Sequence, residues 1–329
     1  YDSGAARSLL ARSVAEDLGL GLGGRGRATG FGGSAELQLA RDVDAVIGGA
    51  THRFEQLVVV DLASFTAPFG REIEFIVGVD VFPQHVVDVD IAAQRLGFVE
   101  RGAFAPPPNA LELVLDNRAN NFTTPILING ERAQANFDLG SGSALDIGPA
   151  FARRLGIDRD ALATGQANGI GGALEVALTS VQSVALAGQT FADVPLQVTG
   201  TPLPTGDANL GFPILSRFRI FIDYRRARAW LEPHAGADAA PFDRDLAGLR
   251  MARAQSDRLS ISYVGRGSPA AAAGLTTRDE IVAIDGARIS DWPAGTDFRA
   301  WSHGVEAGRA VRLTLADGRD VSLTLQRFY

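Results

Sequence analysis

Alternating apolar and polar positions predict β-strands through most of the chain, because a period of two turns one face of each strand toward a core. In the first hundred residues these runs are 36–39, 54–60, 75–81 and 86–91. Residues 9–18 instead have the apolar spacing of a short helix. The stretch 19–33 holds too many glycines for a packed element, and we expect it to be a loop region.

A second group of strands is predicted between residues 110 and 233. Its runs are 125–127, 133–137, 174–178, 181–186, 194–198, 217–223 and 227–231. Asn129–Gly130 predicts the hairpin turn between the first two runs, and 151–155 predicts a short helix. The three prolines within 102–109 predict a linker before this group. Two groups of strands with one short helix each favour β-barrels or sandwiches over a doubly wound sheet.

The last part of the chain, from about residue 241, has a different pattern. Its predicted strands are 259–264, 280–284, 311–315 and 321–325, and its predicted helices are 269–273 and 297–303. The small residues of 234–240 predict a boundary before it. We therefore expect a mainly β protein with three domains, at 1–102, 103–236 and 237–329.

Composition and charge exclude several function classes. The chain of 329 residues has a formal net charge of −7, whereas a nucleic-acid partner would require a basic face. It contains no cysteine for disulfides or a thiol nucleophile, and its four histidines lack metal-ligand spacing. No apolar run reaches the length of about 18 residues that a membrane span needs. We expect no metal, no organic cofactor and no membrane span.

The chain repeats one short signal, an aspartate followed by any residue and then glycine. It occurs as Asp2-Ser3-Gly4 and as Asp138-Leu139-Gly140. Further pairs follow in the same order: Leu18-Gly19-Leu20 with Leu155-Gly156-Ile157, Gly30-Phe31-Gly32-Gly33 with Gly169-Ile170-Gly171-Gly172, Ile76-Val77-Gly78 with Asn209-Leu210-Gly211, and Asp90 with Asp223. Two carboxylates brought together cannot both ionise easily, so they share a proton and work as general acid and base. Each aspartate alone would be interpreted as a turn cap, and the duplication favours a catalytic pair.

With these motifs, residues 1–233 resemble the two lobes of a bacterial pepsin-like or retropepsin-like aspartic peptidase. The resemblance implies two β-barrel lobes, each supplying one catalytic aspartate, here Asp2 and Asp138. It also implies that the ionised carboxylate activates a water, which attacks a peptide carbonyl. In that family an apolar-apolar-glycine segment packs beneath each turn; Ile76-Val77-Gly78 matches it, and Asn209-Leu210-Gly211 matches it less fully.

The residues beside the two aspartates are expected to support the pair. Gly4 and Gly140 let the backbone approach the carboxylates closely and donate to them. In the family a serine or threonine after each aspartate locks the lobes together through buried hydroxyl bonds. Ser3 can make such bonds, and Leu139 cannot. We also expect the Ser141 hydroxyl to donate to the second aspartate, which makes the two carboxylates unequal.

Gly30, Phe31, Gly32 and Gly33 fall where the resemblance places the flap, a hairpin that closes over substrate. For the matching stretch 169–172, a plain hairpin turn is at least as plausible as a second flap, since one flap suffices in bilobal members. A phosphate-binding loop would need a helix after the glycines, and the residues that follow Gly33 alternate like a strand.

Residues 237–329 resemble a PDZ domain of the type associated with bacterial proteases. The matching segments are 267–270, 273–275 and 279–286. The resemblance implies that an extended peptide, often a C-terminus, adds to a sheet edge. Its carboxylate-binding loop would fall in 247–251 and its edge strand at 259–264. Peptide binding is thereby assigned to Gly248, Leu249, Met251, Leu259 and Ile261. The alternative is a packing domain that binds nothing.

The sequence therefore predicts an aspartic endopeptidase acting on an extended polypeptide, with a PDZ domain that recruits substrate or binds a C-terminal peptide. The alternative is an inactive scaffold or peptide-binding protein that retains the fold, which Leu139 favours. Because bacterial proteases joined to PDZ domains are commonly exported, we expect a periplasmic, envelope-associated or secreted protein. Only Tyr1 precedes Asp2, so we expect the strand leading into that turn, and any targeting segment, to lie outside the given sequence.

Overall fold

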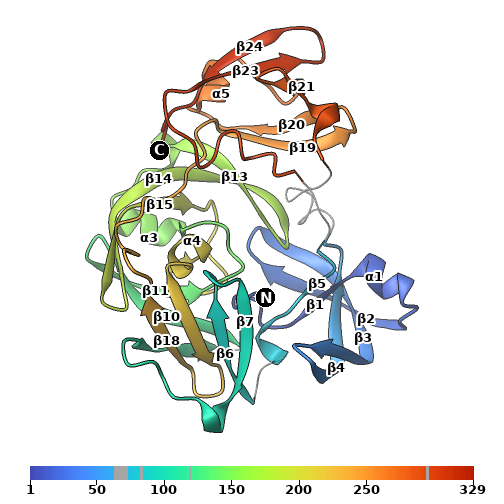
Figure 1. The fold of residues 1–329 in the computed structure, drawn as a ribbon, viewed down its shortest axis with the longest axis vertical. Helices are drawn as coiled ribbons and strands as arrows, with labels where there is room; N and C mark the ends of the chain where they lie inside the picture. Colours follow the sequence, from blue (N-terminus) through green and yellow to red (C-terminus); the bar gives the residue numbers. More distant parts are fainter. Residues whose placement is uncertain (63–72, 82–83, 119, 294–295) are drawn as a thin grey trace.

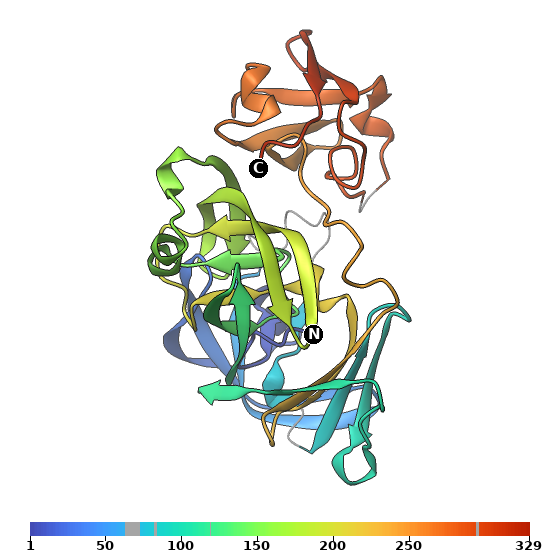
Figure 2. The same ribbon diagram turned by 90° about the vertical axis from the view of Figure 1, so that its left-hand side faces the viewer.

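The computed structural model is mainly β and describes residues 1–62, 73–81, 84–118, 120–293 and 296–329 (Figures 1 and 2). Within these ranges the strands form a first sheet, a second sheet, a sheet shared between the two repeats, and a C-terminal sheet. One large hydrophobic core joins the first three sheets, and the C-terminal sheet has a core of its own. No helix in the described ranges is long and apolar enough to cross a membrane.

The first sheet has the strand order β2-β3-β4-β1-β5. Its elements are β1 (Leu9–Ala11), α1 (Arg12–Asp17), β2 (Leu22–Gly30), β3 (Gly33–Ile47), β4 (Ala50–Val60) and β5 (Phe75–Ile76). The strands predicted at 36–39 and 54–60 lie within β3 and β4. The helix predicted over 9–18 begins only at Arg12, because the preceding residues pair with β4 on one side and β5 on the other.

The glycine-rich stretch 19–33 is a strand and a hairpin turn, so its prediction as a loop region was wrong. Residues Leu22–Gly30 form β2, which pairs with β3 along its whole length. Backbone hydrogen bonds make this ladder without any contribution from side chains. Because β2 is the outer strand of its sheet, few of its positions need a side chain that packs.

The second sheet has the order β13-β14-β15-β12-β16-β11-β10-β9 and closes into a barrel by pairing β14 with β10. Its strands are β9 (Asp116–Arg118), β10 (Asn121–Ile128), β11 (Glu131–Phe137), β12 (Leu145–Ile147), β13 (Ala163–Gly169), β14 (Gly172–Leu186), β15 (Gln189–Val198) and β16 (Ala208–Leu210). Helices α3 (Pro149–Arg154), η4 (Arg159–Ala161) and α4 (Phe212–Leu215) lie on the connections. The runs predicted separately at 174–178 and 181–186 form one strand, β14.

The shared sheet, of order β7-β6-β17-β18-β8, contains strands from both repeats. Its strands are β6 (His85–Asp90), β7 (Arg95–Glu100), β8 (Leu111–Val114), β17 (Phe218–Asp223) and β18 (Arg228–Pro233), and the 3-10 helices η2 (Val79–Val81) and η3 (Arg101–Ala103) flank β6 and β7. The joint between the repeats is the pairing of β6 with β17. The buried Asp88 of β6 reinforces it through a 2.9 Å ion pair with Arg219 of β17.

Strands β1 and β12 occupy corresponding places in the first and second sheets. Each is a three-residue strand after an aspartate turn, and each leads into a short helix, α1 or α3. Each pairs in parallel with a long strand, β4 or β15, and antiparallel with a short one, β5 or β16. The two aspartate turns are therefore presented by the same local arrangement.

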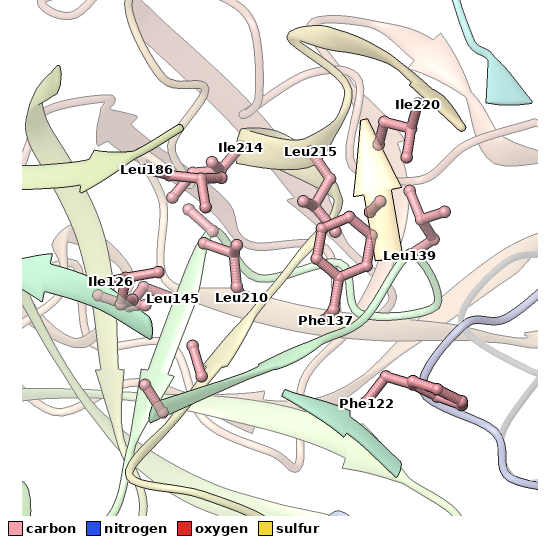
Figure 3. Packing of buried hydrophobic residues seen from close by; sticks show 14 of the residues in the cluster. Phe122, Ile126, Phe137, Leu139, Leu145, Leu186, Leu210, Ile214, Leu215 and Ile220 are labelled. Atoms are coloured by element: carbon pink, nitrogen blue, oxygen red, sulfur yellow. The ribbon is translucent and has the colours of Figure 1, made fainter. Parts of the chain in front are cut away.

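The large core lies directly behind the second aspartate turn. Figure 3 shows Phe137, Leu139, Leu215 and Ile220 lying close together there. Leu139 is only 8% exposed. The residue that departs from the expected serine or threonine is thus a core residue, whose side chain stabilises the turn by packing.

The C-terminal domain has the strand order β19-β20-β21-β23-β24, with β22 paired to β21. Its elements are β19 (Leu249–Gln255), β20 (Arg258–Val264), α5 (Pro269–Ala272), β21 (Glu280–Ile284), β22 (Ala287–Arg288), η5 (Ile289–Asp291), β23 (Ala310–Leu315) and β24 (Asp320–Thr324). The segment 297–303 forms turns and not the predicted helix. The Asp297 carboxylate accepts from the Arg299 backbone amide, and such a local bond competes with helix formation.

The strands at the two ends of this sheet are β19 and β24, and the prediction of an edge at 259–264 was wrong. Strand β20 pairs with β19 on one side and with β21 on the other. Its residues Leu259 and Ile261 are 0% and 2% exposed and belong to the core of the domain. These two side chains therefore lie inside the domain, away from any peptide added at its edge.

The C-terminal domain contacts the second sheet at β13, and Figure 1 shows it beyond the β13–β14 hairpin. The Thr164 amide donates to the Arg266 carbonyl over 3.0 Å, and the Tyr263 hydroxyl donates to Thr164 Oγ1 over 2.6 Å. The boundary segment 234–241 is ordered by Arg217, whose guanidinium donates to the carbonyls of Ala237 and Ala240.

Candidate active site

The two aspartate turns have matching backbone hydrogen bonds. The Gly4 amide donates to Asp2 Oδ1 over 2.8 Å, and the Gly140 amide donates to Asp138 Oδ1 over 2.9 Å. The aspartate amides donate to the carbonyls of Val77 and Leu210, over 2.9 and 3.0 Å respectively. Each carboxylate is thereby oriented by its own turn, and each turn is fixed to the segment beneath it.

The fold brings these two turns into direct contact. A Cβ atom placed on Gly4 would lie 2.5–2.8 Å from the carboxylate atoms of Asp138. A Cβ atom on Gly140 would overlap the carboxylate of Asp2 in the same way. Each glycine therefore makes room for the aspartate of the opposite turn. The sequence suggested that each glycine lets its own backbone approach the aspartate of the same turn. The structure adds that each glycine must lack a side chain because the carboxylate of the opposite turn fills that space.

The glycines of the supporting segments are packed equally tightly. A Cβ atom on Gly78 would lie 2.7 Å from the Arg7 carbonyl oxygen, and one on Gly211 would lie 2.9 Å from the Ser141 carbonyl oxygen. Both distances are shorter than real Cβ contacts. These segments lie directly beneath the two turns, as the motif Ile76-Val77-Gly78 and its counterpart predicted.

Ser3 makes a hydrogen-bonded bridge between the two turns. Its hydroxyl donates to the Phe137 carbonyl over 2.8 Å and accepts from the Leu139 amide over 2.8 Å. Ser3 is 1% exposed, so both bonds are shielded from water. Leu139 has no hydroxyl with which to make the matching bonds from the second turn to the first. Apolar packing of Leu139 replaces this half of the expected interlock.

Burial and a neighbouring carboxylate both act on the pKa of Asp138. Burial, followed by the charge of Asp2, raises the pKa of Asp138 to about 8. The Asn209 side chain opposes this by a hydrogen bond that lowers the pKa of Asp138. The protonated form of Asp138 is therefore favoured at neutral pH.

Ser141 does not have the expected role. Its hydroxyl is bonded to Ser143 Oγ at 2.9 Å, and Ser143 in turn donates to the buried Asp146. The side chain that reaches Asp138 comes from Asn209 on β16. Sequence reasoning missed Asn209 and Asp146. The available signal was a polar residue in each of two short strands that are otherwise apolar.

A cavity of about 690 Å³ opens at the pair and is lined by Asp2, Asp138, Gly4 and Gly140. The β2–β3 and β13–β14 hairpins line it with their tips, including Gly30, Phe31 and Ile170. The structure thus brings the pair, its two supporting glycines and part of the predicted flap to one cavity.

The two hairpin tips contact each other. The Gly171 amide donates to the Phe31 carbonyl over 3.4 Å, and a Cβ atom on Gly169 or Gly171 would overlap backbone atoms of 31–33. Gly32 in the turn of the first tip and Gly33 at the start of β3 have φ values of 82° and 118°, which favour glycine. The tip at 169–172 therefore meets the first tip at the cavity.

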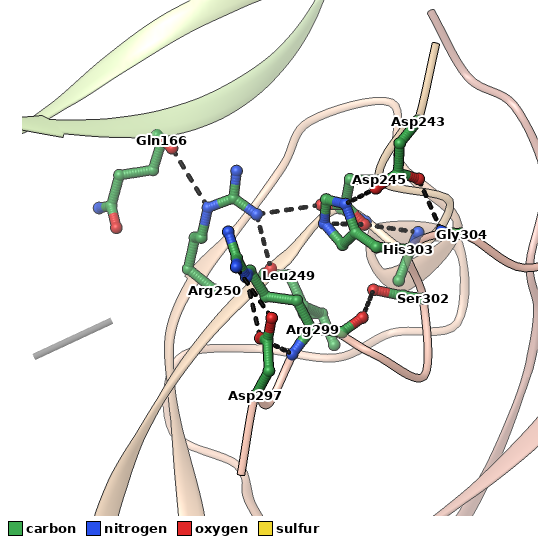
Figure 4. A network of polar contacts seen from close by, with 12 residues as sticks. Gln166, Asp243, Asp245, Leu249, Arg250, Asp297, Arg299, Ser302, His303 and Gly304 are labelled. Carbon is green, nitrogen blue, oxygen red and sulfur yellow. Dashed lines mark hydrogen bonds and ion pairs between the residues drawn. The ribbon is translucent and has the colours of Figure 1, made fainter. Parts of the chain in front are cut away.

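Two of the five residues predicted to bind a peptide in the C-terminal domain, Gly248 and Leu249, also line this cavity. The amides of Ala247 and Gly248, in the expected carboxylate-binding loop, already donate to Asp245 Oδ1 over 2.9 and 3.1 Å. Figure 4 shows Asp245 within a network that includes Arg250 and His303. A side chain of the protein itself therefore occupies the site expected for a peptide carboxylate.

Comparisons with known proteins found similarity over parts of this chain. A family model described as aspartyl protease matches residues 124–214, which include the second aspartate turn and Asn209. A retropepsin-like aspartic protease from Rickettsia conorii, known from a crystal structure, is similar over 39% of this chain and 95% of that chain, with 23% identity and a TM-score of 0.32. No curated protein matches the chain. The family match covers residues 124–214 alone, and it supports a relationship to aspartyl proteases for that part of the chain.

Proposed function

We propose that this protein is an aspartic endopeptidase in which Asp2 and Asp138 form the catalytic pair. The single observation that supports it most is the crossed packing, in which each turn glycine leaves room for the opposite carboxylate. Like charges this close and this buried are costly unless one is protonated. A fold without a catalytic use for the pair would gain stability by replacing either aspartate.

The reaction proposed for the pair is direct attack by water. The ionised carboxylate accepts a proton from a water molecule, whose oxygen attacks the peptide carbonyl carbon. The protonated carboxyl donates to the carbonyl oxygen as negative charge develops there. Collapse of the tetrahedral intermediate breaks the C–N bond, and the proton taken from water passes to the leaving amine. The pair then regains its single shared proton.

The substrate proposed is an extended polypeptide. The cavity is bounded by the tips of two β-hairpins, whose backbone groups suit a peptide in strand conformation. The tips contact each other, so at least one hairpin must move for a chain to enter. Leu139 favours the alternative, an inactive scaffold, but Ser3 alone still bridges the turns.

The test is cleavage of a diverse peptide mixture from pH 4 to 8 by the full chain, with Asp2→Asn and Asp138→Asn variants. Asp160→Asn, with a side chain that is 91% exposed, is the matched control for the charge change. We expect the wild type and the control to cleave, and both pair variants to be inactive. No cleavage by folded wild-type protein, or retained activity in either pair variant, would refute the proposal.

We further propose that the C-terminal domain acts as a PDZ domain that recruits substrate, which requires the peptide carboxylate to displace Asp245 Oδ1 from the Ala247 and Gly248 amides. In Asp245→Ala these amides are free. Peptides with a free C-terminus should then bind the Asp138→Asn chain more tightly when Asp245→Ala is added, and amidated peptides should not. Equal binding of both peptide forms would contradict carboxylate capture.

We also propose a periplasmic or envelope location, which rests on resemblance alone. Fractionation of bacteria that express the full natural gene tests it, and recovery of the protein only with cytoplasmic markers would contradict it.

A further inference from the structure

Behind Asp138, four neighbouring strands carry a row of buried polar side chains. The row crosses β12, β16, β11 and β10, and its members are Asp146, Asn209, Asn136 and Thr123. Strand register places each member opposite the next, and residues in such positions point to the same face of a sheet. Asp146 is 1% exposed, and the other three are at most 9% exposed.

Hydrogen bonds connect this row to the proposed catalytic pair. The Asn209 amide group donates to Asp146 Oδ2 over 3.3 Å, and its carbonyl accepts from Asn136 over 2.9 Å. The Asn209 side chain also bonds to Asp138, and that bond favours the ionised form of Asp138. Asn209 therefore lies between a carboxylate of the pair and a second carboxyl group that is fully buried.

Packing alone does not account for an acidic residue at Asp146. Its Oδ1 atom is buried without a hydrogen-bond partner among the described residues. The corresponding middle residue of β1 is Leu10, whose neighbours across the sheet are Val59 and Phe75. A strand in this place can therefore be wholly apolar. Burial of a carboxyl group with one unpartnered oxygen is unfavourable, which points to a use for it.

We propose that Asp146 is a positioning residue that acts through Asn209 and keeps the shared proton on the Asp2–Asp138 pair at neutral pH. The inference rests on the proposed function of that pair. An ionised Asp146 adds a negative charge to the same buried region, and this charge opposes loss of the last proton from the pair. A neutral Asp146 has no such effect.

The surroundings of Asp146 leave its charge available to act on the pair. The strands on either side of β12 present Gln197 and Asn209 to it, and neither side chain titrates. The nearby titratable groups are the pair itself, with Arg7 on the first turn and the charged residues of 243–303 lining the same cavity. Burial raises the pKa of Asp146 to about 6. Asp146 therefore ionises below the pH at which Asp138, with its pKa of about 8, loses the shared proton.

The experiment is the pH profile of kcat/KM for the wild type, Asp146→Asn and Asn209→Leu, with Asp160→Asn as the exposed control. Asp146→Asn should lower the upper midpoint by about one pH unit, the size of a buried like-charge effect, and leave the lower midpoint unchanged. Asn209→Leu should raise the upper midpoint, because Asp138 loses the hydrogen-bond donor that lowers its pKa. Loss of structure alone would not move the upper midpoint in opposite directions in the two variants.

A carboxyl ¹³C NMR titration separates failure of this inference from failure of the proposed function. The Asp138 signal is assigned by its disappearance in Asp138→Asn and followed in the same variants. If the wild type cleaves nothing, the proposed function fails, but a lowered upper midpoint for Asp138 in Asp146→Asn still supports the coupling. An unchanged midpoint in that variant overturns the inference whether or not the protein cleaves. Should Asp146→Asn not fold, an unchanged upper midpoint in Asn209→Leu overturns it.

Discussion

The Ser3 bridge between the two aspartate turns can be tested by Ser3→Ala, which removes one oxygen atom. That atom accepts from the Leu139 amide and donates to the Phe137 carbonyl, and both bonds measure 2.8 Å. Because Ser3 is 1% exposed, water cannot replace it without rearrangement. Each buried backbone group left without its partner costs about 1–3 kcal/mol, so the loss of both partners should lower the free energy of unfolding by about 2–6 kcal/mol.

Urea unfolding followed by circular dichroism measures this loss. The free energies of unfolding of the two proteins are compared on the condition that their m values agree. Ser290→Ala is the control, because Ser290 is exposed and its hydroxyl donates to the adjacent Asp291. We expect kcat/KM to fall about tenfold in Ser3→Ala as well, since the turns are no longer held in register. A free energy of unfolding within about 0.5 kcal/mol of the wild type would refute the view that Ser3 joins the turns.

Three further predictions follow from the same contacts. Gly140→Ala should abolish cleavage while the protein still folds, because the new Cβ overlaps the Asp2 carboxylate. Measurable cleavage with unchanged midpoints of the pH profile would contradict this. Thr164→Val removes one of the two acceptors of the Tyr263 hydroxyl and the acceptor of the Arg266 amide, so hydrogen exchange in the β13–β14 hairpin should accelerate, and exchange at wild-type rates would show that these bonds do not hold the hairpin. The pKa of Asp138 is higher in the folded state, at about 8, than in the unfolded state, so its burial weakens folding as pH rises from about 4 to 8, by at most about 1.4 kcal/mol per pH unit. The stability of Asp138→Asn relative to the wild type should therefore increase over this range in urea titrations, and a constant difference would contradict the assignment.

The alternation of apolar and polar residues predicted the strands well where the apolar positions pack into the core. The runs at 133–137 and 194–198 fall within β11 and β15, because their apolar positions face the core. Prediction failed where a partner strand decides the structure. Leu9–Ala11 has helical spacing, yet it is a strand because β4 and β5 provide hydrogen-bond partners on both sides. The glycines of β2 likewise form a strand because β3 lies beside them.

The order of strands in a sheet also depends on partners. Leu259 and Ile261 alternate as an edge strand would, and nothing in that alternation shows whether a second neighbour exists. The structure supplies that neighbour in β19. An alternating pattern reports one buried face of a strand, whereas the edge is defined by unpaired backbone groups, which carry no sequence signal.

By itself the sequence determined the two aspartate–glycine turns, the mainly β architecture and the absence of a hydroxyl at Leu139, because these depend on residue type and short-range spacing. Only the tertiary structure decided that Gly4 faces Asp138, that the two hairpin tips meet, and that Asn209 joins Asp138 to Asp146. Each of these contacts joins segments that are far apart in the chain. Their register is set by the packing of whole sheets, which no local pattern encodes.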